Sequence, residues 1–245
     1  MAKIALVTGG SRGIGAATCR LLARDGWDVA VNYRADANAA AAVVRDIEAT
    51  GQRAIAVKAD VADEAEVLAM FETVERDLGA INGLVNSAGI IGPVGRVEAL
   101  TRADIDRVLA TNVVGCILTC REAVKRMSTK HGGKGGAIVN VSSGSAYLGN
   151  PGKQVLYAIS KGAVNSLHIG LSQEVAGEGV RVNAVSPGMT ATDMVNDEAA
   201  AANMANIPMG RLGEPGEIAE AIVWLLSDQA GYTAGANIRV AGGRP

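Results

Sequence analysis

The regular alternation of short apolar runs with longer helical patterns constrains the fold of this chain more than any other feature. Helical patterns occupy residues 14–25, 37–50, 63–78, 101–128, 154–177 and 217–227, and they separate strand-like runs at 3–7, 28–32, 53–58, 81–85, 137–142, 180–185 and 237–240. Strands that alternate with helices indicate βαβ units, whose parallel strands are covered on both faces. The sequence therefore predicts an α/β fold with a doubly wound, seven-stranded parallel sheet and helices on both faces.

Length and composition agree with one domain and exclude a nucleic-acid partner. The 245 residues are 49% apolar and 20% charged, which allows a sizeable core, and no linker or repeat divides them. Residues 1–245 are therefore expected to form a single dinucleotide-binding and catalytic domain. The net charge is −2 and no basic block is present, so the chain lacks the electrostatic footprint of a nucleic-acid-binding protein.

Signals for a membrane, for secretion and for a metal are missing from the sequence. No apolar stretch approaches the ~20 residues that span a bilayer, and the first residues lack the features of a signal peptide. We therefore expect a cytoplasmic protein with no membrane partner. The cysteines Cys19, Cys116 and Cys120 form no CxxC pair, and there is no HExxH pattern. Neither a disulfide framework nor a metal site is expected.

A glycine-rich turn follows the first strand, with the sequence Thr8-Gly9-Gly10-Ser11-Arg12-Gly13-Ile14-Gly15. Glycine permits a tight turn and a close approach of phosphate to the backbone, and the helix that follows offers free N–H groups. The segment is not a P-loop, because no Gly-Lys-Ser/Thr follows. An ordinary glycine-containing turn is the alternative. In this context the turn predicts a Rossmann-type site for the pyrophosphate of a dinucleotide.

The end of the second strand predicts which dinucleotide is bound. An acidic residue there would bind the 2′-hydroxyl of NAD, whereas a basic residue suits the 2′-phosphate of NADP. This chain has Asn32-Tyr33-Arg34 and no acid before Asp36, and Arg12 projects from the glycine turn. Because arginine binds phosphate well, NADP(H) is the expected cofactor. The alternative is that Arg34 is an ordinary solvated surface charge.

A tyrosine and a lysine lie four residues apart on the predicted helix 154–177, as Tyr157 and Lys161. Residues at this spacing share a helix face, and a nearby ammonium favours a phenolate that can exchange a proton with a carbonyl or alcohol. The pair alone is a weak motif. The pair becomes significant through its context, because polar or glycine-containing segments also follow strands one, four, five and six. A doubly wound sheet builds its site at these strand ends.

Taken together, these motifs resemble the short-chain dehydrogenase/reductase family, in its compact single-domain branch, over residues 5–243. The resemblance implies catalysis by Asn112, Ser143, Tyr157 and Lys161. It implies that the cofactor contacts Gly9, Ser11, Arg12, Gly13, Ile14, Gly15, Arg34, Asp60, Val61, Asn86, Ala88, Gly89, Tyr157, Lys161, Pro187, Gly188, Thr190 and Thr192.

The resemblance also implies a role for each catalytic residue. Tyr157 would be the general acid in reduction and the base in oxidation, and Lys161 would favour its ionised form and hold the nicotinamide ribose. Ser143 would donate a hydrogen bond to the substrate oxygen, and Asn112 would fix a water that supplies protons. One departure concerns the gap between Ser143 and Tyr157, which holds one residue more than in many relatives. We expect the extra residue within 150–156, and Ser142 and Ser145 are alternatives to Ser143.

The substrate is expected to be a small carbonyl compound or alcohol, beneath a lid at about residues 188–213. The chain is similar to 3-oxoacyl-carrier-protein reductases and equally to sugar and polyol dehydrogenases. Gln173 stands where the carrier-protein enzymes have a basic residue, which weakens that assignment. A non-catalytic NADP(H)-binding sensor is the alternative from another class, but it would not need the four catalytic residues. The resemblance further implies a homotetramer in which the helices at 101–128 and 154–177 pair across a two-fold axis.

Overall fold

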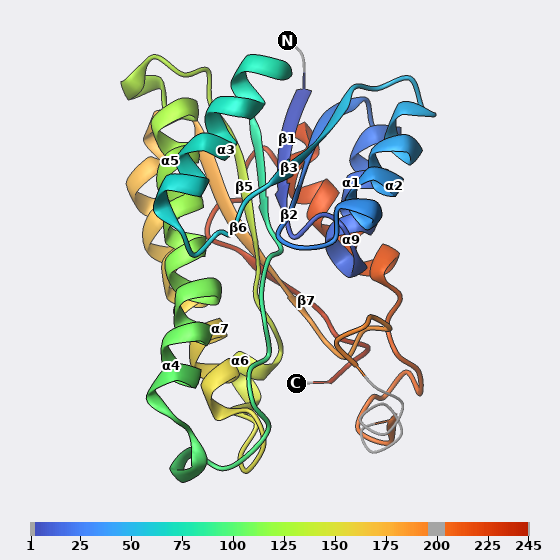
Figure 1. The fold of residues 1–245 in the computed structure, drawn as a ribbon, viewed down its shortest axis with the longest axis vertical. Helices are drawn as coiled ribbons and strands as arrows, with labels where there is room; N and C mark the ends of the chain where they lie inside the picture. Colours follow the sequence, from blue (N-terminus) through green and yellow to red (C-terminus); the bar gives the residue numbers. More distant parts are fainter. Residues whose placement is uncertain (1–2, 196–203, 245) are drawn as a thin grey trace.

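A parallel sheet lies between two layers of helices in the computed structural model, which describes residues 3–195 and 204–244 (Figure 1). Within those residues the sheet has seven strands in the order β3-β2-β1-β4-β5-β6-β7. The predicted fold class is confirmed. The strands are β1 (Lys3–Thr8), β2 (Trp27–Tyr33), β3 (Ala54–Lys58), β4 (Gly83–Asn86), β5 (Gly136–Val141), β6 (Val180–Pro187) and β7 (Asn237–Val240).

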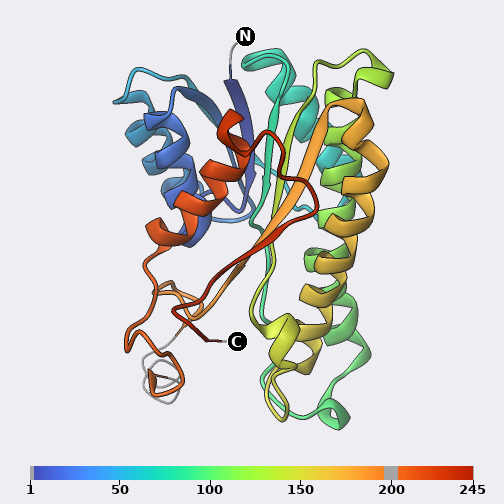
Figure 2. The same ribbon diagram turned by 180° about the vertical axis from the view of Figure 1, so that it is seen from behind.

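The apolar runs are continuous because both faces of the sheet are buried. On β1, Ala5 and Val7 pack against α1, α2 and α9, whereas Ile4 and Leu6 pack on the opposite face, which α3, α5 and α7 cover. Figure 2 shows the same layers from behind. The main helices are α1 (Gly13–Arg24), α2 (Ala37–Glu48), α3 (Glu64–Asp77), α4 (Arg102–Leu109), α5 (Gly115–Met127), α6 (Ser145–Leu148), α7 (Val155–Val175) and α9 (Pro215–Leu226).

Short side chains begin several of these helices. Asp36 and Asp63 accept hydrogen bonds from the first turns of α2 and α3, and Thr101 forms a capping box with Asp104 at α4. Pro215 occupies the first position of α9, where its missing N–H is harmless. Single 3₁₀ turns cover Val97–Ala99, Thr129–His131, Ala176–Glu178 and Asp228–Ala230. No helix in the described part of the chain is long and apolar enough to cross a bilayer.

The helix expected at 101–128 is interrupted by a π-helical turn at Ala110–Val114, between α4 and α5. The interruption places Asn112 inside the wider turn. A π turn inserts an extra residue without ending the helix, so the 3.6-residue periodicity of the sequence gives no sign of it.

The fourth strand begins at Gly83, two residues later than expected. Asn82 explains the shift, because its Oδ1 accepts the N–H of Ile4 at 2.9 Å and its own N–H reaches the carbonyl of Ile4 at 3.0 Å. The Asn82 side chain thus accepts a hydrogen bond that a strand carbonyl would otherwise accept. The regular pairing of β1 with β4 therefore begins one residue later, at Gly83. The four-residue helix α6 was not expected from the sequence.

Candidate active site

A cleft of about 870 Å³ opens at the carboxyl ends of the strands, where residues distant in sequence meet. Its walls come from the segments after all seven strands, β1 to β7, and from the start of α7. The strand order places β1 beside β4. From β1 the chain continues to β2 and β3 on one side, and from β4 it continues to β5, β6 and β7 on the other side. A crevice forms at such a switch point, and doubly wound folds bind their ligands there.

The glycine turn after β1 is shaped for close contact with a ligand. Gly9 and Gly13 have positive φ angles of 62° and 53°, which glycine adopts freely. A Cβ on Gly9 would lie 2.9 Å from the Cα of Ala88, and a Cβ on Gly15 would lie 2.3 Å from the carbonyl oxygen of Gly9. The first turn of α1 has no side-chain cap and no acidic residue. This cradle, with free N–H groups at its edge, fits the pyrophosphate of a dinucleotide.

Thr8 holds the segment after β4 against this turn. Its Oγ1 accepts the backbone N–H groups of Ser87 at 3.1 Å and Ala88 at 3.2 Å. Ala88 and Gly89 therefore line the cleft. The side chain of Asn86 faces the interior instead, where it donates to Asn140 Oδ1 at 2.9 Å. A cofactor contact at Asn86 would have to come from its backbone.

The two predicted arginines lie at the outer end of the cleft. Arg34 is 3.6 Å from Asp60, and Arg12 is 4.0 Å from Asp193. Their side chains are 62% and 72% exposed, so solvent screens both contacts strongly. Asp60 also accepts the N–H of Ala62 through Oδ1. The position after β2 therefore presents a cation that solvent and a bound phosphate can both reach.

Tyr157 and Lys161 lie one turn apart on α7, and both line the cleft. The Lys161 ammonium is 5.8 Å from the centroid of the Tyr157 ring. Lys161 is only 5% exposed, and its Nζ donates to the carbonyl of Val141 at 2.8 Å. Among the described residues no carboxylate forms a salt bridge with this ammonium. A buried cation with N–H groups to spare is suited to hydroxyl ligands.

Asn112 lies behind the cleft, in the π turn, and joins two of its walls. Its Oδ1 accepts the N–H of Ile90 at 2.8 Å, while its Nδ2 donates to the Ile90 carbonyl at 2.8 Å and to Ser160 Oγ at 3.0 Å. With Lys161 it lines a cavity of about 10 Å³. A polar cavity of this size is about large enough for one water.

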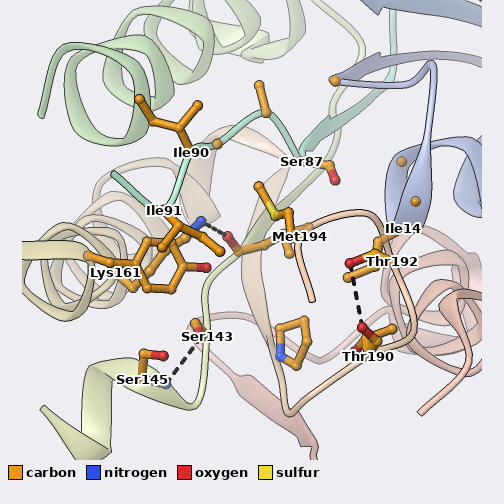
Figure 3. Close-up of a pocket in the computed structure, with 18 of the residues that line it drawn as sticks. Ile14, Ser87, Ile90, Ile91, Ser143, Ser145, Lys161, Thr190, Thr192 and Met194 are labelled. Carbon is orange, nitrogen blue, oxygen red and sulfur yellow. Dashed lines mark hydrogen bonds between the residues drawn. The ribbon is translucent and has the colours of Figure 1, made fainter. Parts of the chain in front are cut away.

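The serines after β5 differ in how their hydroxyls are used. Ser142 is buried and donates to Asn165 Oδ1 at 2.6 Å, with a second contact to the Lys161 carbonyl at 3.2 Å. Ser143 lies on the cleft wall, where its Oγ accepts the N–H of Ser145 at 3.1 Å (Figure 3). Burial thus leaves Ser143 and Ser145, but not Ser142, with a hydroxyl available to a ligand.

The segment after β6 forms another wall of the cleft. A Cβ on Gly188 would lie 2.7 Å from the Cα of Ala241, so only glycine fits there. Thr190 donates to the Gly188 carbonyl at 3.1 Å, and Thr192 and Met194 also face the cleft (Figure 3). Of the expected lid at 188–213, residues 196–203, which include Asp197 and Glu198, lie outside the described residues.

Several residues that line the cleft were not predicted from the sequence as site residues. The wall beside Ser143 and Tyr157 is mainly apolar, but it contains polar side chains at Asn150, Lys153 and Gln154. The Gly-Asn-Pro-Gly sequence at 149–152 indicates a turn, and this was the only available hint. The additional lining residues include Tyr33, Ile91, Val94, Leu148, Asn150, Gln154, Met189, Ala241 and Arg244. Among the described residues no group of three metal-ligating side chains comes together.

A doubly wound fold with this glycine turn, and with a tyrosine and a lysine one helical turn apart in the cleft, defines a dinucleotide-dependent oxidoreductase. A family model described as enoyl-(acyl carrier protein) reductase matches residues 9–244. The chain belongs to the short-chain dehydrogenase/reductase family of oxidoreductases. The resemblance seen in the sequence is therefore confirmed.

Three relatives show how far the similarity extends. An uncharacterized oxidoreductase from Escherichia coli, YgfF, is 51% identical, over 98% of this chain and 99% of its own. The 3-oxoacyl-[acyl-carrier-protein] reductase FabG of Staphylococcus aureus is 39% identical, over 99% of this chain and 98% of its own. A crystal structure of a short-chain dehydrogenase from Burkholderia cenocepacia in complex with NADP has a TM-score of 0.92 and 37% identity, covering 98% of this chain and 97% of that one.

Proposed function

We propose that the chain reduces a carbonyl group to an alcohol, or catalyses the reverse reaction, with NADP(H) as cofactor. The observation that carries this proposal is the buried ammonium of Lys161 beside Tyr157, on the wall of a cleft that also contains the glycine cradle. The nicotinamide, when bound, would donate or accept a hydride. A protein that only senses the cofactor has no need for an acid–base group supported in this way, which disfavours the sensor alternative.

We infer the following division of work among the residues. In reduction, the Tyr157 hydroxyl gives its proton to the oxygen that becomes the alcohol, and in oxidation it takes that proton back. Ser143 donates a hydrogen bond to the same oxygen, which stabilises negative charge there. The Lys161 ammonium stabilises the ionised tyrosine and binds the ribose hydroxyls. Asn112, through the small cavity that it shares with Lys161, holds a water that returns the proton.

The choice of NADP(H) rests on charge at the outer end of the cleft. Arg34 and Arg12 would bind the 2′-phosphate, and no carboxylate occupies the position directly after β2. The related Burkholderia structure was solved with NADP. The remaining proposed cofactor contacts are the lining residues of the glycine turn and the segments after β3, β4 and β6.

The wall of the cleft supports a proposal for the substrate class. Leu148, Ile91, Val94 and Met194 make it mainly apolar, which favours a ketone or a 3-oxoacyl compound over a sugar or polyol. A relative is named as a 3-oxoacyl-[acyl-carrier-protein] reductase, but Gln173 leaves the chain without that enzyme class's basic residue. We therefore propose a small carbonyl substrate that need not be presented by a carrier protein.

We further propose one domain over residues 1–245, with a substrate lid at about 188–213, in a cytoplasmic homotetramer. Exposed apolar side chains support the assembly, because α5 and α7 present Ile117, Ile159 and Ile169 at 45–57% exposure. Apolar residues that gather on neighbouring helices mark a protein–protein contact.

Replacement of one hydroxyl tests the proposed reaction. Tyr157→Phe should lower kcat for ketone reduction by NADPH by ~10²–10⁴-fold, because only the proton donor is removed. Affinity for NADPH, measured by fluorescence titration, should stay close to that of the parent. Tyr232→Phe is the matched control, since Tyr232 is fully exposed and outside the cleft. A Tyr157→Phe enzyme with most of its kcat would show that the acid–base assignment is wrong.

A further inference from the structure

Asn150 has an unusual backbone conformation at the edge of the cleft. Its φ angle is 47°, and among the described residues it is the only one other than glycine with a positive φ. It lies in the connection between α6 and α7, within the segment where the additional residue before Tyr157 was expected. Asparagine tolerates the left-handed region better than most residues, although glycine would adopt it at less cost. The choice of asparagine over glycine therefore requires a reason in the side chain.

The side chain of Asn150 lies between two other polar groups of the cleft wall. Its Nδ2 donates to Ser145 Oγ at 2.9 Å and, over a longer distance of 3.4 Å, to Gln154 Oε1. All three residues are half-buried and line the cleft. The group adjoins the proposed reaction centre, since the N–H of Ser145 donates to Ser143 Oγ and Gln154 lies three residues before Tyr157.

The direction of these hydrogen bonds decides what the wall offers to a ligand. Ser145 and Gln154 both accept a hydrogen bond from Asn150, so neither uses its own donor for this contact. The hydroxyl hydrogen of Ser145 and the Nε2 hydrogens of Gln154 remain able to donate. Within residues 3–195 and 204–244, neither donor has a hydrogen-bond partner. The mainly apolar wall thus contains two unused donors beside the residue proposed to bind the reacting oxygen.

We propose that Asn150 is a positioning residue that orients Ser145 and Gln154 as hydrogen-bond donors to a second oxygen of the substrate. This inference rests on the proposed function and makes its substrate class more specific. The preferred substrates carry an acceptor oxygen close to the reacting carbonyl, as in β-keto esters, thioesters and diketones. A simple ketone of the same length leaves both donors without a partner when it displaces water from the wall, and unpaired polar groups cost affinity.

Two substitutions separate the backbone conformation of Asn150 from the polarity of its side chain. Asn150→Asp keeps size and tolerance of positive φ, but a carboxylate only accepts hydrogen bonds. It would draw the donors of Ser145 and Gln154 toward itself. Asn150→Gly also keeps the backbone conformation, and it leaves both donors free but unoriented.

The probes are ethyl acetoacetate and 2-heptanone, which have main chains of equal length and differ by the ester group. We expect the ratio of their kcat/KM values with NADPH to fall about tenfold in Asn150→Asp, which corresponds to 1.4 kcal/mol. The fall in Asn150→Gly should be smaller. The dissociation constants of both probes are then measured in the presence of NADP⁺, which cannot reduce a ketone. The ratio of these two constants is compared between the parent and each variant.

The outcomes distinguish this inference from the proposed function. A parent enzyme that reduces neither ketone contradicts the proposed function, whereas the affinity ratio still tests Asn150. An Asn150→Asp ratio within a factor of two of the parent overturns the inference, and so does an equal loss for both probes, which would indicate a structural role only. An Asn150→Gly enzyme with the parent's ratio would overturn the donor-orienting role, because its donors have lost the side chain that orients them.

Discussion

At the level of single residues, Arg34 is the proposed determinant of cofactor choice. A charge-assisted hydrogen bond contributes about 1.5–3 kcal/mol, but Arg34 is 62% exposed and near Asp60, so screening reduces its effect. We predict that Arg34→Ala lowers the preference for NADPH over NADH by about tenfold, measured as the ratio of the two kcat/KM values. Arg76→Ala is the control, because Arg76 has a similar exposure of 66% and does not line the cleft. An unchanged ratio in Arg34→Ala would leave Arg34 as a surface charge.

His168 on α7 links stability to pH. It is 1% exposed, and burial lowers the pKa of its imidazole below the usual value. An unfolded chain protonates this residue near pH ~6.5, before the folded chain does. The contribution of His168 to stability is therefore fully present above that pH and is lost as the pH falls below it, because the unfolded state then binds more protons.

We predict that His168→Leu makes the free energy of unfolding fall less steeply between pH 6.5 and 5. Urea unfolding at several pH values measures the slope. His131→Leu provides the comparison, since His131 is exposed. Identical slopes in the parent and His168→Leu would mean that acid sensitivity arises elsewhere.

At the level of elements, the start of α5 packs closely against the segment that follows β3. A Cβ on Gly115 would lie 2.8 Å from Val61 Cγ2 and 2.9 Å from the Val61 carbonyl oxygen. We predict that Gly115→Ala destabilises the fold by about 1–3 kcal/mol, although alanine is the better helix former. Because Val61 lines the cleft, KM for NADPH should rise as well.

Chemical denaturation and steady-state kinetics measure both effects of Gly115→Ala. In Gly216→Ala, on α9, the new methyl group meets no atom within 4 Å. That control should be as stable as the parent or more stable. A Gly115→Ala protein with the parent's stability would mean that α5 moves away from Val61 without cost.

The strands were predictable from the sequence because their apolar runs reflect burial on both faces. The glycine turn and the Tyr157–Lys161 pair were predictable because their chemistry depends on local spacing. Features that depend on tertiary contacts were not predictable from the sequence. The inward direction of Asn86, the commitment of the Ser142 hydroxyl to Asn165, and the position of Asn150 between two donors each depend on residues from other elements. The π turn at Asn112 also left no periodic signal.

At the level of the whole molecule, the exposed apolar side chains of α5 and α7 predict assembly. We expect light scattering at micromolar concentration to give the mass of a tetramer, and Ile117→Glu to reduce it, because a buried unpaired carboxylate is costly. Val97→Glu is a suitable control, since Val97 is 56% exposed but lies in the 3₁₀ turn before α4. A monomeric parent would contradict the proposed assembly.

The central position of β1 has a consequence for synthesis on the ribosome. Of the strands in this sheet, β1 emerges first, and it pairs with β2 on one side, but its other side has no partner until β4 at residues 83–86 is made. Until then the nascent chain carries an open strand edge in the middle of its future core, and such edges invite pairing with other chains. At that stage Tyr157 and Lys161 have not yet been made, and neither has Ala88, against which the glycine turn packs. We therefore expect nascent chains that stop before β4 to associate with other chains more readily than longer ones.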